Sequence, residues 1–382
     1  PAAPPLLQLH SPELRKLLFV QQYEAYTQYG HFVGLRASRL EARLAARRGK
    51  TRLLQIVDGT LVNDPKERWS VRATFRIMSD QFESLKLSAS MGGMSGMHEQ
   101  SAKEPDFVHI RPPYGFLHQG NQDESEFAAN AASWLEDKII EIGVSNVAAF
   151  VAEPIQGAGG VIVPPAGYFK HIQEICRRHD ILFVADEVIT GFGRTGQWFA
   201  SQTMELEPDM MALAKGLTSG YVPMSAVMVG DRVANKLIVD GGEFYHGFTY
   251  SGHPVAAAVA LANLELIERE DMITRVREDT GPYLAEALAP LAEHRIVGEI
   301  RTFGVLAAIE LVKSKDGPEM FEDTGATGVI CRDHAINRGL MMRAVRDAMI
   351  LSPALTYSRA DIDETVRIAS QALDATADQL GL

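Results

Sequence analysis

The chain has 382 residues, of which 46% are hydrophobic and 23% charged, a composition that supports a large buried core and two or three domains. The net charge of −12 argues against nucleic acid as a general partner, and no apolar stretch reaches the roughly 18 residues of a membrane span. Cys176 and Cys331 lie far apart in the sequence, which predicts free thiols in a reducing, cytoplasmic setting, and no Cys/His spacing indicates a metal site.

The first 86 residues differ from the remainder in charge. They carry 14 basic and 8 acidic residues, against 23 basic and 41 acidic residues in the rest of the chain. Their start shows no basic segment followed by an apolar one, so we expect no signal peptide. We predict three parts: an atypical basic segment at 1–88, a large domain at 89–288 and a small C-terminal domain at 289–382.

Beyond about residue 105, apolar runs alternate with amphipathic helices. The runs lie at 146–154, 181–188 and 208–216, and a helix with one apolar face is predicted at 166–180. This alternation indicates a parallel sheet with both faces covered. Ligands of such sheets bind outside the carboxyl ends of the strands, and Glu153, Asp186 and Lys215 each stand at that end of a predicted strand.

The last third of the chain predicts a smaller α+β domain. Residues 253–289 are helical in pattern, with an interruption at 279–283 that is expected to bend the run. Short strands are predicted within 294–311 and 340–355. A final helix over 358–380 would begin after a serine N-cap.

Lys215 ends a buried run, although lysine is the side chain least willing to lose its water. One explanation is that the amine simply reaches solvent at the strand end, and Asp186 taken alone would suit a turn or a helix cap. Together, a lysine and an aspartate at strand ends suit pyridoxal 5′-phosphate chemistry. The amine forms a Schiff base with the cofactor aldehyde, and the carboxylate keeps the pyridine nitrogen protonated.

Four motifs carry a resemblance to a known family: "FVAEPIQGAGG" (150–160), "ILFVADEVITGFGRTG" (181–196), "AKGLTSGYVP" (214–223) and "HGFTYSGHP" (246–254). The sequence resembles the class III, or omega, aminotransferases, over roughly residues 87–382. With the ending "LMMRAVRDAMILSPAL" (340–355), it is most similar to omega-amine:pyruvate transaminases. The resemblance implies the α/β fold type I of pyridoxal-phosphate enzymes, with a mostly parallel large-domain sheet and a smaller α+β C-terminal domain.

The resemblance also implies roles for the residues at the strand ends. Lys215 would be the Schiff-base lysine and the general base that moves the substrate proton. Asp186 would pair with the pyridine nitrogen, Val188 would press on one face of the ring, and Glu153 would lie near the ring as a polar gate.

Two further residues receive roles from the resemblance. Thr249 would donate to the cofactor phosphate of the partner subunit, which implies a homodimer or a dimer of dimers. Arg343 would bind the carboxylate of the keto acid as a bidentate fork, the alternative being a surface salt bridge.

One motif is set aside. "GFGRTG" (191–196) fits the glycine pattern of a dinucleotide-binding turn. Such a turn follows its strand directly and opens a helix, whereas here five residues intervene and no helical pattern follows at once.

The resemblance ends upstream of residue 87. The aromatic Tyr-His-Gly element of the family and its small-residue phosphate-binding turn are both absent from the sequence there, and Phe82 is a poor substitute for the aromatic ring. A diverged segment, a misassigned or out-of-frame segment, and missing residues are the competing explanations. Arg346 stands where the family has glycine and would crowd the substrate site.

These features predict a pyridoxal-phosphate-dependent transaminase. It would move an amino group from an omega-amine or omega-amino acid to pyruvate by a ping-pong mechanism, with small amines and keto acids as its partners. The alternative is a non-catalytic homologue of the same fold, deficient in cofactor, that acts as a binding or structural dimer.

Overall fold

The computed structural model describes residues 17–21 (backbone only), 88–93, 98, 106–237, 250–315 and 319–382. Residues 1–22 and 110–382 form one compact unit, and residues 23–109 form another. In the described part of the second unit, His98 hydrogen-bonds to the carbonyl oxygen of Gly92 and His109 to that of Met91. The expectation for Phe82 lies outside the described residues.

The elements of the larger unit fall into two groups. The first comprises β1 (Leu17–Gln21), α4 (Gly115–His118), α5 (Glu124–Ile142), β2 (Ala149–Ala152), α6 (Tyr168–Arg178), β3 (Leu182–Asp186), α7 (Ala200–Thr203), β4 (Met210–Leu213), β5 (Ser225–Val229), α8 (Asp231–Asn235) and α9 (Pro254–Arg269). The second comprises α10 (Met272–Arg275), α11 (Gly281–Leu288), β6 (Val297–Phe303), β7 (Leu306–Leu311), α12 (Ala326–Ile336), β8 (Arg343–Val345), β9 (Ala348–Leu351) and α13 (Arg359–Leu380).

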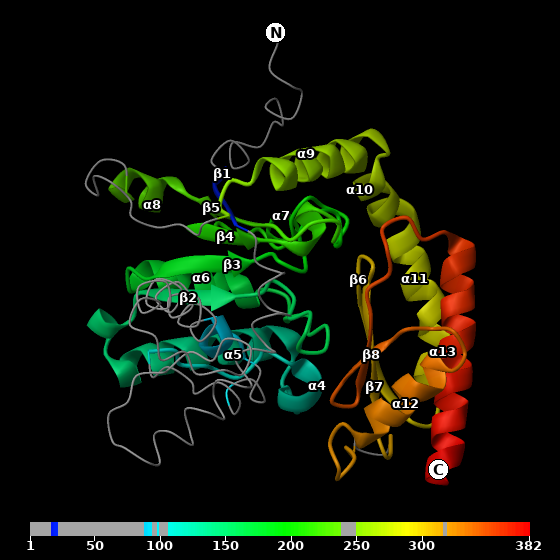
Figure 1. Cartoon of the computed structure of the whole chain (residues 1–382). Coiled ribbons are helices and arrows are strands. Elements are labelled where there is room, and N and C mark those ends of the chain that lie inside the picture. Colours follow the sequence, from blue (N-terminus) through cyan, green and yellow to red (C-terminus); the bar gives the residue numbers. More distant parts are fainter. Residues whose placement is uncertain (1–16, 22–87, 94–97, 99–105, 238–249, 316–318) are drawn as a thin grey trace, which may run out of the picture. The chain divides into compact units, whose positions relative to one another are not determined.

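The first group is built on a five-stranded sheet in the order β1-β5-β4-β3-β2 (Figure 1). Strands β2, β3 and β4 are parallel, as predicted, while β5 runs antiparallel to β4 and β1 antiparallel to β5. Ala152 of β2 pairs with Ala185 of β3, and Asp186 pairs with Ala212 of β4. This register brings the carboxyl ends of the three parallel strands to one edge of the sheet.

Two hydrophobic clusters hold the sheet. In the first, Phe183 of β3 packs against Phe169 of α6 and Phe127 of α5. In the second, Leu213 of β4 packs with Ile267 of α9. Helix α5 begins at a reciprocal capping box formed by Asp123 and Glu126.

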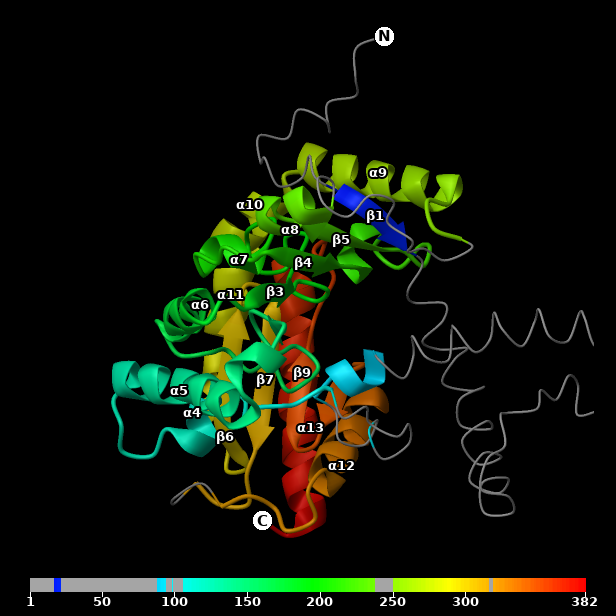
Figure 2. The ribbon, with the colours of Figure 1, turned by 90° about the vertical axis from the view of Figure 1, so that its left-hand side faces the viewer.

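The second group is an antiparallel sheet in the order β6-β7-β9-β8, covered by α11, α12 and α13 (Figures 1 and 2). All six residues of β7 are buried. The interruption predicted at 279–283 lies slightly earlier, because a π-helical turn at Val276–Thr280 separates α10 from α11, which begins at Gly281. A further break, at Glu270 and Asp271 between α9 and α10, was not predicted. Ser358 caps α13, as predicted. The boundary at 288/289 stays a prediction. Within the described residues, no helix has the length and apolarity needed to cross a membrane.

Candidate active site

The three polar side chains singled out in the sequence stand at one edge of the parallel strands. Glu153 directly follows β2, Asp186 is the last residue of β3, and Lys215 lies two residues after the end of β4. The β2–β3 register, continued by one residue, sets Glu153 beside Asp186. The strands therefore bring together a carboxyl pair and an amine, as the sequence predicted.

Asp186 is a half-buried carboxyl with one hydrogen bond. Its Oδ1 accepts from the backbone N–H of Val188, with the two atoms 3.0 Å apart. Burial raises the pKa of this carboxyl above its ordinary value, against the lowering effects of the Val188 hydrogen bond and of the Lys215 ammonium. No described residue forms an ion pair with Asp186 within 4 Å, so its carboxylate can pair with a cationic group of a ligand.

Glu153 is held by a tight turn. Its Oε2 accepts from the N–H of Gly157, with the atoms 2.9 Å apart. Burial and the neighbouring charge of Asp186 raise the pKa of Glu153 to about 7. Gly157 is required here because a Cβ would lie 2.6 Å from Cδ1 of Ile189, a residue of the loop that follows β3. This close approach joins the Glu153 turn to that loop.

Lys215 opens a 3₁₀ turn over Lys215–Leu217 with a left-handed backbone, at φ +39°. Asn263 of α9 fixes this turn, because its Nδ2 donates to the carbonyl oxygens of Gly216 and Leu217 at 2.8 and 3.1 Å. The side chain of Lys215 is exposed. Exposure alone agrees with a solvated lysine, but a strained backbone whose following turn is held by two hydrogen bonds is typical of a functional position.

The other predicted residues are placed unevenly. Val188 is half-buried in the turn after Asp186. Arg343 is exposed on β8, and no described residue forms an ion pair with it. Thr249 lies outside the described residues, so its predicted contact with the phosphate is not placed. Arg346 adopts a left-handed backbone, at φ +53°, in the turn between β8 and β9.

The loop at 191–196 joins the two groups of elements. Gly196 is left-handed, and a Cβ there would lie 3.0 Å from the Cα of Arg277. Gly304, in the β6–β7 turn, approaches so closely that a Cβ would lie 2.5 Å from the carbonyl oxygen of Arg194. The glycines therefore serve close packing between segments. No helix begins at the loop, since α7 starts at residue 200, which agrees with setting aside a dinucleotide site.

Two clusters were missed in the sequence. Glu187 is wholly buried beside Asp186, and Arg301 is buried with Tyr114, Glu299 and Glu310. A glutamate inside an apolar run was the available signal for Glu187. The Arg301 cluster left no local signal, because its members come from distant segments.

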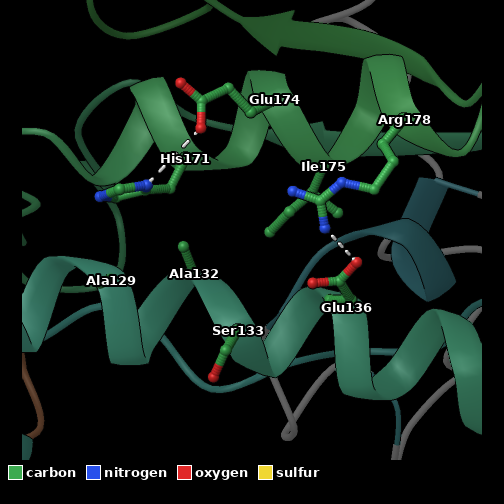
Figure 3. A pocket seen from close by; sticks show the side chains of 8 residues that line it. All are labelled: Ala129, Ala132, Ser133, Glu136, His171, Glu174, Ile175 and Arg178. Atoms are coloured by element: carbon green, nitrogen blue, oxygen red, sulfur yellow. Dashed lines mark hydrogen bonds and ion pairs between the residues drawn. The ribbon is translucent and has the colours of Figure 1, made fainter.

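A small cavity lies between α5 and α6 (Figure 3), and its lining includes none of Glu153, Asp186 and Lys215. It measures about 140 Å³, and its charged groups pair with one another: Arg178 with Glu136 at 2.5 Å and His171 with Glu174 at 3.8 Å. Both carboxyl groups that line the cavity therefore have a basic neighbour. Among the described residues, no group of three His, Cys, Asp or Glu side chains would hold a metal ion.

The strand-end residues fit the predicted cofactor. A half-buried carboxyl with one hydrogen bond and no cation among the described residues suits a pyridinium nitrogen, and an exposed lysine amine suits an aldehyde. Asp186 and Lys215 supply these two groups from neighbouring strands.

Comparison with known proteins identifies what this chain resembles. The sequence model described as Aminotransferase class-III matches residues 80–373. The putrescine–pyruvate aminotransferase of Pseudomonas aeruginosa is 53% identical over 289 residues, which are 75% of this chain and 63% of that protein. The vanillin aminotransferase of Capsicum annuum is 40% identical over 295 residues, 76% of this chain and 64% of that protein.

A solved structure gives the same result. The omega transaminase from Pseudomonas jessenii in complex with PMP has a TM-score of 0.73 and 40% identity, covering 77% of this chain and 66% of that one. The predicted fold class is therefore confirmed. The chain spans less than two thirds of the length of the curated relatives, so activity, substrates and partners are matters for proposal.

Proposed function

The chain belongs to the class III aminotransferases, and from that premise we propose that it is a pyridoxal-phosphate-dependent transaminase acting on omega-amines with pyruvate as acceptor. The observation that carries the proposal is the juxtaposition of Lys215, Asp186 and Glu153 at one edge of three parallel strands. Its overall chemistry converts an amine and pyruvate into a carbonyl compound and alanine.

Lys215 and Asp186 divide the chemical work. When bound, the cofactor supplies an aldehyde that takes up the amino group and a ring that accepts electrons. Asp186 holds a proton at the ring nitrogen through the charge of its half-buried carboxylate. Lys215, through its Nζ, removes the proton from the donor carbon that bears the nitrogen, and delivers a proton to the acceptor carbon in the second half of the reaction.

The remaining residues bind and orient. Val188, in the turn after Asp186, packs on one face of the ring, and Glu153 presents a carboxyl whose pKa of about 7 lets it exist as a neutral acid. Arg343 binds the pyruvate carboxylate with two parallel N–H bonds. Its exposed guanidinium, free of ion pairs with described residues, supports this role.

The donor is proposed by analogy. One relative carries the name putrescine–pyruvate aminotransferase, so a diamine is the first donor to test. Because one site handles both substrates in turn, the amine leaves as a carbonyl product before pyruvate binds, which is a ping-pong cycle.

The same proposal extends to assembly and location. We propose a homodimer or a dimer of dimers, supported by apolar side chains exposed on and near α9, with Tyr221 at 83% and Val255 at 58% exposure. A cytoplasmic setting is supported by Cys176 and Cys331, which are both free and buried.

The test combines a spectrum with an assay. Purified protein is titrated with pyridoxal phosphate, and alanine formation is measured with putrescine and pyruvate. The proposal expects a new visible absorption band and turnover, both abolished in Lys215→Ala. Lys170→Ala, which removes an exposed lysine of α6, is the matched control and keeps both. Absence of band and turnover in the parent protein would favour the non-catalytic alternative, and turnover in Lys215→Ala would overturn the assignment.

A further inference from the structure

Glu187 lies between two residues assigned to the cofactor, yet takes no part in the proposed chemistry. It directly follows Asp186 and precedes Val188, and its side chain is 0% exposed. An isolated carboxylate is very costly to bury, so such a group persists only where hydrogen bonds compensate for its lost water. Its contacts therefore indicate what it holds in place.

Each carboxylate oxygen of Glu187 accepts two hydrogen bonds. Oε1 accepts from the backbone N–H and the hydroxyl of Ser201, at 2.6 and 2.7 Å. Oε2 accepts from the N–H of Ala200 at 3.1 Å and from the hydroxyl of Thr190 at 2.5 Å. Four donors from two segments thus converge on one side chain. They join the start of α7 to the turn after β3.

The backbone of Glu187 is fixed as firmly as its side chain. Its N–H donates to the carbonyl oxygen of Ala212 at 3.0 Å, in the strand that leads to Lys215. Its own carbonyl oxygen accepts from the N–H of Gly191 at 2.9 Å, and a Cβ on Gly191 would lie 2.9 Å from that oxygen. The residue is therefore bonded to β4, to the turn and to α7 at once.

This arrangement bears directly on Asp186. Glu187 directly follows β3 and continues its pairing with β4 through the N–H bond to Ala212. Because side chains alternate along an extended chain, anchoring Glu187 on one face turns Asp186 to the other. Asp186 in turn accepts from Val188 on the far side of Glu187. Any loosening of Glu187 would move the peptide units on both sides of it, and with them the carboxyl and the ring-facing valine.

We propose that Glu187 is a positioning residue that fixes Asp186 and Val188 against the cofactor ring and holds both in register with the Lys215 strand. The inference rests on the proposed function, because it assumes that these residues face pyridoxal phosphate. Glu187 touches neither cofactor nor substrate. It acts through the backbone on each side of it.

The test substitutes the carboxylate while keeping its shape. Glu187→Gln keeps one acceptor oxygen but points an amide donor at the N–H of Ala200, so the network loosens without a cavity. We expect the dissociation constant for pyridoxal phosphate to rise about tenfold, equivalent to about 1.4 kcal/mol. We also expect the pH at which the absorption band of bound cofactor changes to shift, because that pH depends on the placement of Asp186.

Asp347 supplies a matched control. It is also a buried carboxyl, 1% exposed, and it caps α12 by accepting from the N–H groups of Gly325 and Gly328, both at 2.9 Å. Asp347→Asn should lower the thermal stability of the apo-protein, as Glu187→Gln does, yet leave cofactor affinity within about twofold. If Glu187→Gln behaves like this control in affinity and spectrum, Glu187 is structural only and the inference is wrong.

Two further outcomes are separable. A parent protein that gives no band overturns the proposed function, whereas a normal parent with an unaffected Glu187→Gln overturns only this inference. If Glu187→Gln does not fold, Thr190→Val removes one of the four donors at constant shape. It should then weaken cofactor binding a few-fold in the same direction, and unchanged binding in that variant would count against the role.

Discussion

Two groups of charged side chains in this chain, one centred on a buried arginine and one half-buried, are held in opposite ways. The first surrounds Arg301, which is 7% exposed and donates to Glu310 at 2.7 Å, to Glu299 at 2.5 Å and to the carbonyl oxygen of Gly160 at 2.7 Å. Tyr114 lies under the guanidinium, with 4.7 Å from its ring centroid to Cζ, and donates to Glu310 at 2.8 Å. Every charge of this cluster has a partner within the protein.

The second group is the strand-end set, where partners are few. Glu153 and Asp186 accept one backbone N–H each and form no ion pair with a described residue. Burial raises the pKa of both carboxyls, whereas Tyr114 and the carboxylates of Glu310 and Glu299 keep the pKa of Arg301 raised in spite of its burial. The contrast indicates that paired charges join segments, while under-partnered ones stand ready for a ligand.

Removal of the Asp186 charge tests this contrast most severely. Asp186→Asn should lower kcat about 10³-fold at saturating cofactor, roughly 4 kcal/mol of barrier, because a neutral amide cannot hold the ring nitrogen protonated. Its fold should persist by circular dichroism. Asp180→Asn, at a side chain 95% exposed before β3, serves as control with less than about a twofold change. A loss below about tenfold for Asp186→Asn would contradict the proposed pairing.

Breaking the paired group should act on stability. Arg301→Met leaves the buried carboxylate of Glu310 and the half-buried one of Glu299 without their cation, and we expect a loss of about 3–5 kcal/mol in the free energy of unfolding. Urea denaturation measures it. The control is Arg177→Met, the same substitution at a solvent-exposed ion pair with Glu207. It should lower the free energy of unfolding by less than about 1 kcal/mol. Equal losses in the two variants would remove the distinction between paired burial and surface pairing.

The raised pKa of Glu153 predicts how the apo-protein responds to pH. Between the ordinary value of 4.5 and about 7, the folded chain keeps a proton that the unfolded chain has lost. Stability should therefore fall as pH rises through this window, and Glu153→Gln should flatten that slope in thermal melts at a series of pH values.

Glu136 provides the opposite sign for the same substitution. Hydrogen bonds from His179 and Arg178 lower the pKa of Glu136, so its contribution is present above the ordinary value and lost as pH falls. Glu136→Gln should leave the slope between 4.5 and 7 unchanged. A slope that survives Glu153→Gln would show that another group takes up the proton.

The strand-end site was predictable because its signals are local. Apolar runs of strand length end at Glu153, Asp186 and Lys215, and the parallel arrangement of β2, β3 and β4 places those ends together. The interruption of the long helical stretch was equally visible, since glycine and proline at 281 and 282 begin a new helix after the π-helical turn.

The Arg301 cluster could not be predicted, because its residues meet only in the folded chain. Glu299, Arg301 and Glu310 lie on a hairpin, but Tyr114 and Gly160 come from segments more than 130 residues away. The role of Glu187 was not predicted for a related reason. Its donors at Ala200 and Ser201 follow a loop whose course no sequence period describes.

The smallest expected effect on stability concerns an exposed arginine outside both groups. Arg346 was expected to crowd the substrate site, which stays untested, but its backbone is left-handed at φ +53° in the β8–β9 turn. That conformation costs a non-glycine residue about 1–2 kcal/mol, of which the greater freedom of glycine in the unfolded chain cancels about 0.4–1 kcal/mol. Arg346→Gly should therefore raise the free energy of unfolding by about 0.5–1 kcal/mol in urea denaturation.

Arg346→Ala removes the same side chain but keeps the backbone penalty, and should leave stability within about 0.5 kcal/mol. Stabilisation by both variants alike would assign the effect to the lost guanidinium instead, and would mean that an exposed, unpaired charge can matter as much as the backbone beneath it.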